Sequence, residues 1–120
     1  MREQEVNCIG YASFRLGFDQ EERFIPPPSL GEILAFHDEV SDISSAEVIG
    51  VVKPGGNDYH TGPTVCHMAI VESDGLISHR RKFGEEVTRE TFEAGLDNYI
   101  KRPEDFTIIF LVRKVQQASS

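Results

Sequence analysis

Residues 66–81 read CHMAIVESDGLISHRR, and this stretch determines the predicted fold. Its two apolar runs, Cys66–Glu72 and Leu76–Arg81, flank the turn-forming sequence Ser-Asp-Gly, which predicts a β-hairpin. A loop centred on residue 73, or a three-residue loop at 73–75, places His67 and His79 on one face of the hairpin. A two-residue Asp-Gly turn places them on opposite faces.

Outside the hairpin, two β-branched segments predict strands and three amphipathic segments predict helices. The strands are Ala46–Lys53 and Phe106–Val115. The first helix begins at or next to Cys8, the second spans about 29–38 and the third spans Thr88–Ile100. Asn7 and Thr88 suit helix N-caps, and Ser29 with Glu32 has the spacing of a capping box. A strand over Glu32–Phe36 is the alternative to the second helix. Consecutive strands with short links predict an α+β fold with an antiparallel sheet of about four strands.

The 120-residue chain has the length of a single domain, 1–120, with a core over about 7–115 and a frayed polar tail at 116–120. Its net charge of −8 argues against nucleic acid and anionic membranes as partners. The longest apolar run, Ile108–Val112, is much shorter than a membrane span. The N-terminus lacks the apolar stretch of a secretory signal, so we expect a cytoplasmic protein. The oligomeric state is left open.

Cys8, His67 and His79 are the candidate catalytic residues. A thiol at a helix N-terminus lies beside unpaired amides and the positive end of the helix dipole, so we expect a lowered pKa for Cys8. Gly10 would let backbone and substrate approach closely. His67 is the candidate base, and His79 would orient its ring. The alternative is structural: Cys8 packs in the core, His67 is a satisfied polar residue at a strand end, and His79 is a solvated strand residue.

A metal site is the weaker interpretation of the Cys66-His67 pair, with His37 and His60 as further ligands. Adjacent strand residues point to opposite faces, which prevents both from facing one ion. Neither a Cys-x-x-Cys nor a His-x-x-x-His spacing is present in the sequence. We therefore expect no metal and no cofactor.

Three short motifs occur in a characteristic order along the chain. They are Asn7-Cys8-Ile9-Gly10, His67-Met68-Ala69-Ile70-Val71-Glu72 and Leu76-Ile77-Ser78-His79, with Arg113 near the end of the last predicted strand. In this order the chain resembles the papain-like cell-wall cysteine peptidases of the NlpC type and the related CHAP amidases. Asn7 stands where that family commonly has Asp. The resemblance covers roughly residues 7–115.

The resemblance implies a papain-like domain whose N-terminal helix carries Cys8 and packs on the sheet. It also implies a thiol hydrolase with a Cys8–His67–His79 triad, acting on a peptide, an isopeptide or a side-chain amide through an acyl-enzyme. Two other functions stay open. One is a catalytically inactive binding or regulatory module on the same fold, and the other is a protein deamidase or toxin-like domain.

Overall fold

The computed structural model describes residues 6–57, 60–81 and 86–114, and the structural statements below concern these residues. Its elements in chain order are α1 (Cys8–Arg15), α2 (Leu30–Leu34), β1 (His37–Val40), the 3₁₀ turn η1 (Ile43–Ser45), β2 (Val48–Lys53), β3 (Thr64–Val71), β4 (Ile77–Arg80), β5 (Val87–Glu90), α3 (Phe92–Gly95), α4 (Asp97–Ile100) and β6 (Thr107–Arg113).

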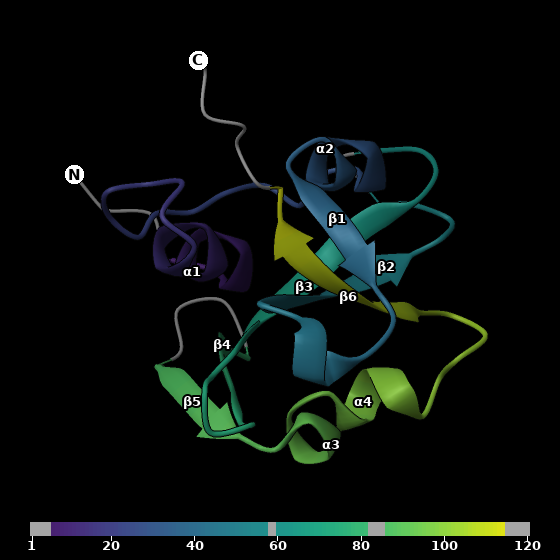
Figure 1. Ribbon diagram of the computed structural model, residues 1–120. Helices are drawn as coiled ribbons and strands as arrows, with labels where there is room; N and C mark the ends of the chain where they lie inside the picture. The colour runs from purple at the N-terminus through teal and green to yellow at the C-terminus, as the bar shows by residue number, and fades with distance from the viewer. Residues whose placement is uncertain (1–5, 58–59, 82–85, 115–120) are drawn as a thin grey trace.

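The described strands form one antiparallel sheet in the order β1-β6-β2-β3-β4-β5 (Figure 1). The predicted α+β class with an antiparallel sheet is confirmed, but the sheet has six strands where about four were predicted. The two additional strands, β1 and β5, lie at its edges and have the polar sequences HDEV and VTRE. An edge strand commonly carries charged residues, so neither segment produces the apolar run from which a strand is predicted.

The helix predicted over Thr88–Ile100 is wrong, because its first residues form β5. Thr91, not Thr88, caps the helical region, and its side chain accepts a hydrogen bond from the amide of Ala94. Two short helices, α3 and α4, meet at Leu96. The helix predicted over 29–38 shortens to α2, where the Ser29–Glu32 capping box is present, and the chain continues as β1.

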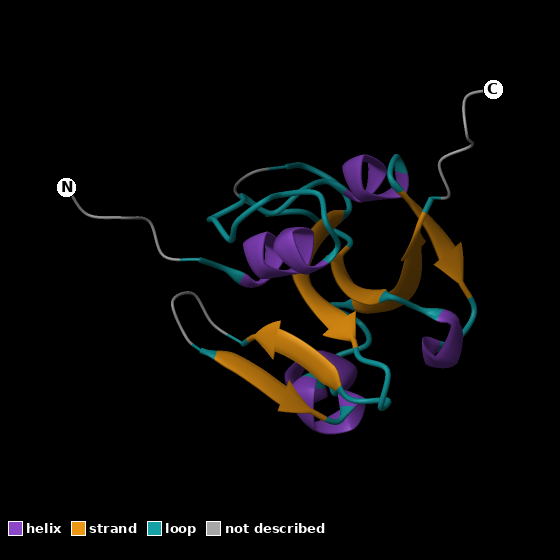
Figure 2. Ribbon diagram, turned by 60° about the vertical axis from the view of Figure 1, so that its left-hand side comes forward, coloured by secondary structure: helices purple, strands orange, loops and turns teal. Residues whose placement is uncertain are grey.

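The sheet separates two apolar clusters, which we call the α1 side and the α4 side. The α1 side holds buried residues of α1 and α2 together with Val65, Met68 and other strand residues. The α4 side holds Leu96 and Tyr99 packed with Ile49, Val51 and others. The strands curve strongly, so that α1 lies close to β3 and β4 while α3 and α4 cover the opposite side (Figure 2). Among the described residues, no helix has both the length and the apolar character needed to cross a bilayer.

A β-bulge at Cys66 changes which side chains share a face. Val51 pairs with His67 while Val52 pairs with Val65, so Cys66 is an extra residue in β3. As a result Cys66 packs with the α4-side cluster, and the His67 ring lies 5.5 Å from the ring of Tyr99 in that same cluster. The expectation that Cys66 and His67 point to opposite faces is therefore wrong, because strict alternation fails at a bulge.

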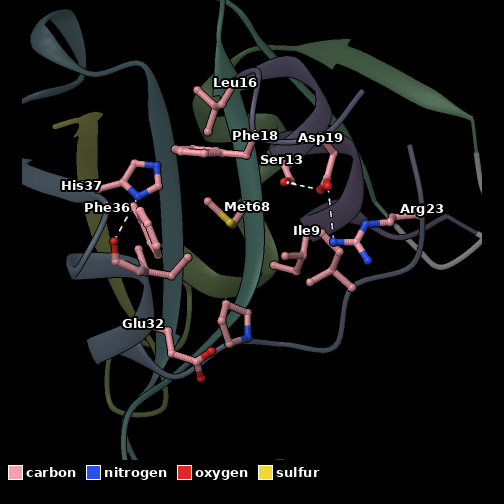
Figure 3. A pocket seen from close by; sticks show the side chains of 13 residues that line it. Ile9, Ser13, Leu16, Phe18, Asp19, Arg23, Glu32, Phe36, His37 and Met68 are labelled. Carbon is pink, nitrogen blue, oxygen red and sulfur yellow. Dashed lines mark hydrogen bonds and ion pairs between the residues drawn. The ribbon is translucent and has the colours of Figure 1, made fainter. Parts of the chain in front are cut away.

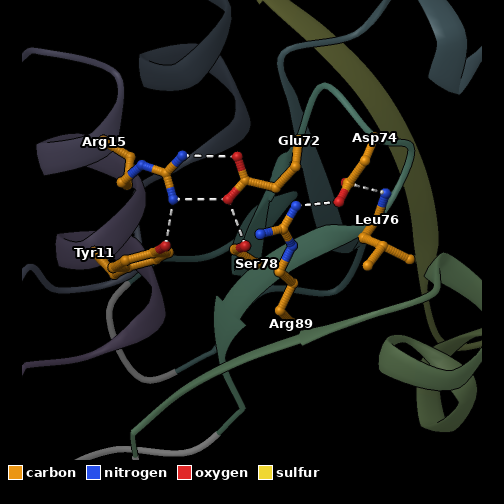
Figure 4. Close-up of polar contacts among 7 residues, drawn as sticks. All are labelled: Tyr11, Arg15, Glu72, Asp74, Leu76, Ser78 and Arg89. Atoms are coloured by element: carbon orange, nitrogen blue, oxygen red, sulfur yellow. Dashed lines mark hydrogen bonds and ion pairs between the residues drawn. The ribbon is translucent and has the colours of Figure 1, made fainter.

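The β3–β4 hairpin has the three-residue loop at 73–75. Ile70 pairs with Ser78 and Val71 with Ile77, and Gly75 has the positive φ of 87° that such a loop requires at its last position. Beside the loop, the carboxylate of Glu72 accepts two hydrogen bonds from Arg15 of α1, at 2.9 and 2.8 Å, and one from Ser78 (Figure 4). This contact fastens α1 to the hairpin.

Candidate active site

Asn7 starts α1 and places Cys8 at the first helical position. Its Oδ1 accepts from the amides of Gly10 at 3.0 Å and Ile25 at 3.2 Å, while its Nδ2 donates to the carbonyl of Ile25 at 2.7 Å. The side chain therefore caps the helix and also holds the segment that follows it. An aspartate would lack the donor for the Ile25 carbonyl, which gives Asn at this position a structural reason.

Gly10 has a structural function that differs from the predicted one. A Cβ atom at this position would lie 1.5 Å from the carbonyl oxygen of Arg23. The space that the missing side chain leaves is therefore filled by the chain's own backbone. The expectation that Gly10 gives substrate close access is wrong, because the Arg23 backbone occupies that position.

The Cys8 thiol lies against the backbone of β3. Its Sγ is 4.0 Å from the carbonyl oxygen of Cys66, and Cys8 is partly exposed. Burial raises the pKa of the Cys8 thiol, and hydrogen bonds from backbone N–H groups, Met68 first among them, lower it by less. The expected low pKa is therefore wrong: the cost of placing a thiolate in these surroundings exceeds the stabilisation from the amides. Cys8 and Cys66 are both free thiols.

His67 and His79 lie together, as the three-residue hairpin loop predicts. Nε2 of His67 is 2.7 Å from Nδ1 of His79, and the two rings are nearly perpendicular at 85°. Both side chains are buried, with exposed fractions of 3% and 1%. They are diagonal neighbours on β3 and β4, and the ring of Tyr99 from α4 lies beside His67 on the same side of the sheet.

Glu90 of β5 continues this series of hydrogen bonds. Its Oε2 is 2.8 Å from Nε2 of His79 and 2.7 Å from Nε of Arg81. The hydrogen bond from Arg81 is the largest of several causes that lower the pKa of Glu90, so the carboxylate is ionised. Gly95 covers the pair closely, since a Cβ there would lie 3.1 Å from Nε2 of His79.

The carboxylate fixes the protons on both rings. Because ionised Glu90 only accepts, Nε2 of His79 carries a proton, and in the neutral ring Nδ1 is then an acceptor. Nε2 of His67 must donate to that acceptor, which leaves Nδ1 of His67 as its unprotonated, basic nitrogen. Burial lowers the pKa of His79, and burial followed by the neighbouring His79 charge lowers that of His67 to about 3. Both rings are therefore neutral at pH 7.

Nδ1 of His67 makes no hydrogen bond to the described residues. Among the described residues, Nε2 of His37 is the single side-chain nitrogen or oxygen that is sealed from solvent and lacks a partner. His67 as a whole residue is 3% exposed. The Cys8 thiol contacts the strand on either side of His67, at Cys66 and Met68. Cys8 packs against the α1-side cluster, whereas the His67 ring lies beside Tyr99 on the α4 side, and no hydrogen bond joins the thiol to either ring within the described ranges.

Cys66 and Tyr99 complete the surroundings of the site. Cys66 donates to the carbonyl of Val51 at 3.4 Å, and burial, followed by the nearby Cys8, raises its pKa to about 11. Burial likewise raises the pKa of Tyr99 to about 12. Arg113 does not take part, because it pairs with Glu47 and with the carbonyl of Leu16. In the part of the chain that the structure describes, no three His, Cys, Asp or Glu side chains are grouped to hold a metal ion.

Sequence reasoning missed Glu90 because the residue was assigned to a helix. Val87 and Thr88 are β-branched and favour a strand, but two such residues carry little weight against the helical stripe that follows. Comparison of the chain with protein-family models, curated proteins and solved structures finds no match.

Proposed function

We propose that the protein is a papain-like thiol hydrolase that cleaves a peptide, an isopeptide or a side-chain amide. Cys8 is the nucleophile, His67 the base and then the acid, and His79 the residue that orients His67. The supporting observation is the hydrogen-bonded series His67–His79–Glu90, which leaves Nδ1 of His67 unprotonated. The Cys8 thiol contacts the backbone of the two residues that flank His67, Cys66 and Met68.

The chemistry is acyl transfer to water. The thiol proton moves to Nδ1 of His67 as sulfur attacks the carbonyl carbon, and the Cys8 amide contributes a donor to the oxyanion. The intermediate collapses to a thioester, and the leaving nitrogen takes the proton back from His67. Water then attacks the thioester while His67 removes its proton, which releases the acid and restores the thiol.

The shifted pKa values determine the resting state of the proposed enzyme. A raised pKa at Cys8 and a lowered one at His67 both favour the neutral thiol and neutral imidazole over an ion pair. Proton transfer is therefore coupled to attack on bound substrate. Glu90 supports this step, because its charge stabilises the protonated His67 through the ring of His79.

The same shifts favour a second function, that of a catalytically inactive binding module on this fold. A thiol that resists ionisation and has no hydrogen bond to its base among the described residues is also what an inactive site would contain. A direct test of acyl transfer separates the two functions.

The test uses p-nitrophenyl acetate as an activated acyl donor. The hydrolase should release p-nitrophenolate in a burst equal to the protein concentration, and mass spectrometry should place one acetyl group on Cys8. Cys8→Ser and His67→Ala should abolish the burst. Cys66→Ser is the matched control and should retain it.

Absence of acetyl-Cys8 in the wild-type protein would refute the hydrolase and leave the binding module. Equal loss in Cys66→Ser would show that the reaction is not specific to Cys8. Ammonia release from N-carbobenzoxy-glutaminylglycine, compared with cleavage of its peptide bond, then distinguishes a deamidase from a peptidase.

A further inference from the structure

A surface groove of about 650 Å³ lies between the segments that follow α1, α2 and β6. Its floor is apolar and aromatic, formed by Leu16, Phe18 and Phe36. The two phenyl rings pack edge to face, with centroids 6.0 Å apart. They are 46% and 62% exposed, the two highest values among the large apolar side chains that the structure describes. Exposed apolar surface gathered in this way is typical of a binding site.

The groove adjoins an apolar cavity of about 300 Å³ between α1, α2 and β3 (Figure 3). Leu16, Phe18 and Phe36 line both spaces, so their side chains stand where the groove meets the cavity. Farther in, the wall includes Ile33 and Met68. Because a cavity of about 150 Å³ holds benzene, this one has room for an alkyl chain of about ten carbon atoms.

The groove carries an excess of positive charge, although the whole chain has a net charge of −8. Its charged lining residues are Glu47, Arg113 and Lys114. Both carboxylate oxygens of Glu47 accept from Arg113, at 3.0 and 2.7 Å, so this pair has no net charge. Lys114 is exposed and makes no ion pair with the residues that the structure describes.

The position of Lys114 links that charge to the aromatic floor. Its backbone amide donates to the carbonyl of Phe36 at 2.9 Å, so the lysine side chain begins beside the exposed ring. A group with one negative charge therefore complements the end of the groove, and an apolar chain complements its floor.

We propose that the groove and the adjoining cavity bind a medium-chain alkyl carboxylate. The carboxylate pairs with the Lys114 ammonium, the first part of the chain lies on the rings of Phe18 and Phe36, and the remainder enters the cavity beside Met68. Burial of the chain supplies most of the affinity, and the exposed ion pair supplies the preference for one sign of charge. A second copy of the protein suits the groove less well, because two chains of charge −8 repel each other.

The proposal is independent of the hydrolase function. The cavity lies on the α1 side, whereas the His67 and His79 rings lie on the α4 side. Ligand binding can therefore be measured with Cys8→Ser protein, and its outcome does not depend on whether the thiol reacts.

The first measurement compares octanoate with octylammonium, which has the same chain length and the opposite charge. Isothermal titration at an ionic strength of about 0.15 M should give a Kd about fivefold lower for octanoate. The net charge of the chain favours the opposite order, so nonspecific attraction does not explain such a result. Lys114→Gln should abolish the preference. Lys101→Gln, at an exposed lysine that follows α4, is the matched control and should keep it.

The second measurement tests the alkyl chain. From hexanoate to decanoate, each added methylene should lower the Kd about fourfold. The terminal methyl group of decanoate should show a nuclear Overhauser effect to the methyl group of Met68. Phe36→Ser should raise the Kd for decanoate about tenfold. Phe14→Ser changes an exposed ring of α1 outside both linings and should leave the Kd unchanged.

The proposal is overturned if octylammonium binds as tightly as octanoate, if the Kd does not depend on chain length, or if neither compound binds. An unchanged preference in Lys114→Gln would also overturn it. A dimer in analytical ultracentrifugation that Phe36→Ser dissociates would assign the groove to a second copy of the chain instead. Lys114 and Phe36 are both exposed, so these variants should fold.

Discussion

At the scale of single residues, Glu90 determines the protonation of a ring that it does not touch. Its carboxylate fixes the proton on Nε2 of His79, and His79 in turn fixes the proton on Nε2 of His67. Loss of the charge at Glu90 would leave both rings free to change tautomer, and Nδ1 of His67 would then carry a proton in part of the population.

Glu90→Gln tests this positioning role. We expect kcat/KM for p-nitrophenyl acetate to fall by about 10- to 100-fold with little change in stability, because the imidazolium loses its counter-charge. The ¹⁵N spectrum of the His67 ring should show mixed tautomers. Glu93→Gln removes an exposed carboxylate of neighbouring α3 and is the control. Full activity with an unchanged tautomer would exclude the role assigned to Glu90.

The sequence allowed the pairing of His67 with His79 to be predicted because a hairpin relates its residues by a short list of loop geometries. The pKa of Cys8 could not be predicted in the same way. It depends on how much protein surrounds the thiol, and that quantity comes from tertiary packing. The groove at Phe18 and Phe36 was also missed, since its lining residues come from distant parts of the chain and meet only in the fold.

At the scale of elements, the position of α1 depends on a glycine that allows close backbone packing. Gly10 lets the helix approach the backbone of Arg23, and Arg15 anchors the other end of the helix to Glu72. The position of Cys8 depends on both contacts, since Cys8 is the first residue of this eight-residue helix.

Gly10→Ala should destabilise the protein by about 2–4 kcal/mol, because the new Cβ collides with backbone that has to move. Gly31→Ala in α2 is the matched control, since its Cβ meets only Ser29 Oγ at 3.9 Å, and it should stabilise by up to about 1 kcal/mol. Urea unfolding measures both. A Gly10→Ala variant as stable as wild type would show that Arg23 does not press on the helix.

Central elements were predicted more reliably than edge elements. β2, β3 and β6 are apolar and β-branched, so their sequences indicate strands directly. The polar edge strands β1 and β5 form because the sheet supplies them with backbone partners, and that information lies elsewhere in the chain.

At the scale of the whole molecule, buried histidines connect stability to pH. His37, His67 and His79 all have lowered pKa values, mainly through burial. Above pH 6.5 these rings are neutral in the folded and unfolded chains alike. Below pH 6.5 the unfolded chain binds protons that the folded chain does not, so the free energy of unfolding decreases as the pH decreases. Glu47 and Glu72, with pKa values of about 2, add a further loss below about pH 4.5.

The free energy of unfolding should therefore decrease between about pH 6.5 and about pH 5, by up to about 1.4 kcal/mol per pH unit for each buried histidine. His67→Gln should reduce this slope by about one proton's contribution. Urea titrations across this range measure both proteins. A flat profile in the wild-type protein, or equal slopes in the two, would contradict the lowered pKa of His67.

The short backbone pairing between β3 and β4 has a consequence for how the molecule opens. That pairing consists of Ile70–Ser78 and Val71–Ile77, and beyond it the strands are joined through the rings of His67 and His79. Acid that protonates both rings breaks this link while the turn stays closed. The edge strands β4 and β5 would then separate from β3, so partial denaturation should begin between His67 and His79 and expose the peptide bonds of β4 and β5 to proteolysis first.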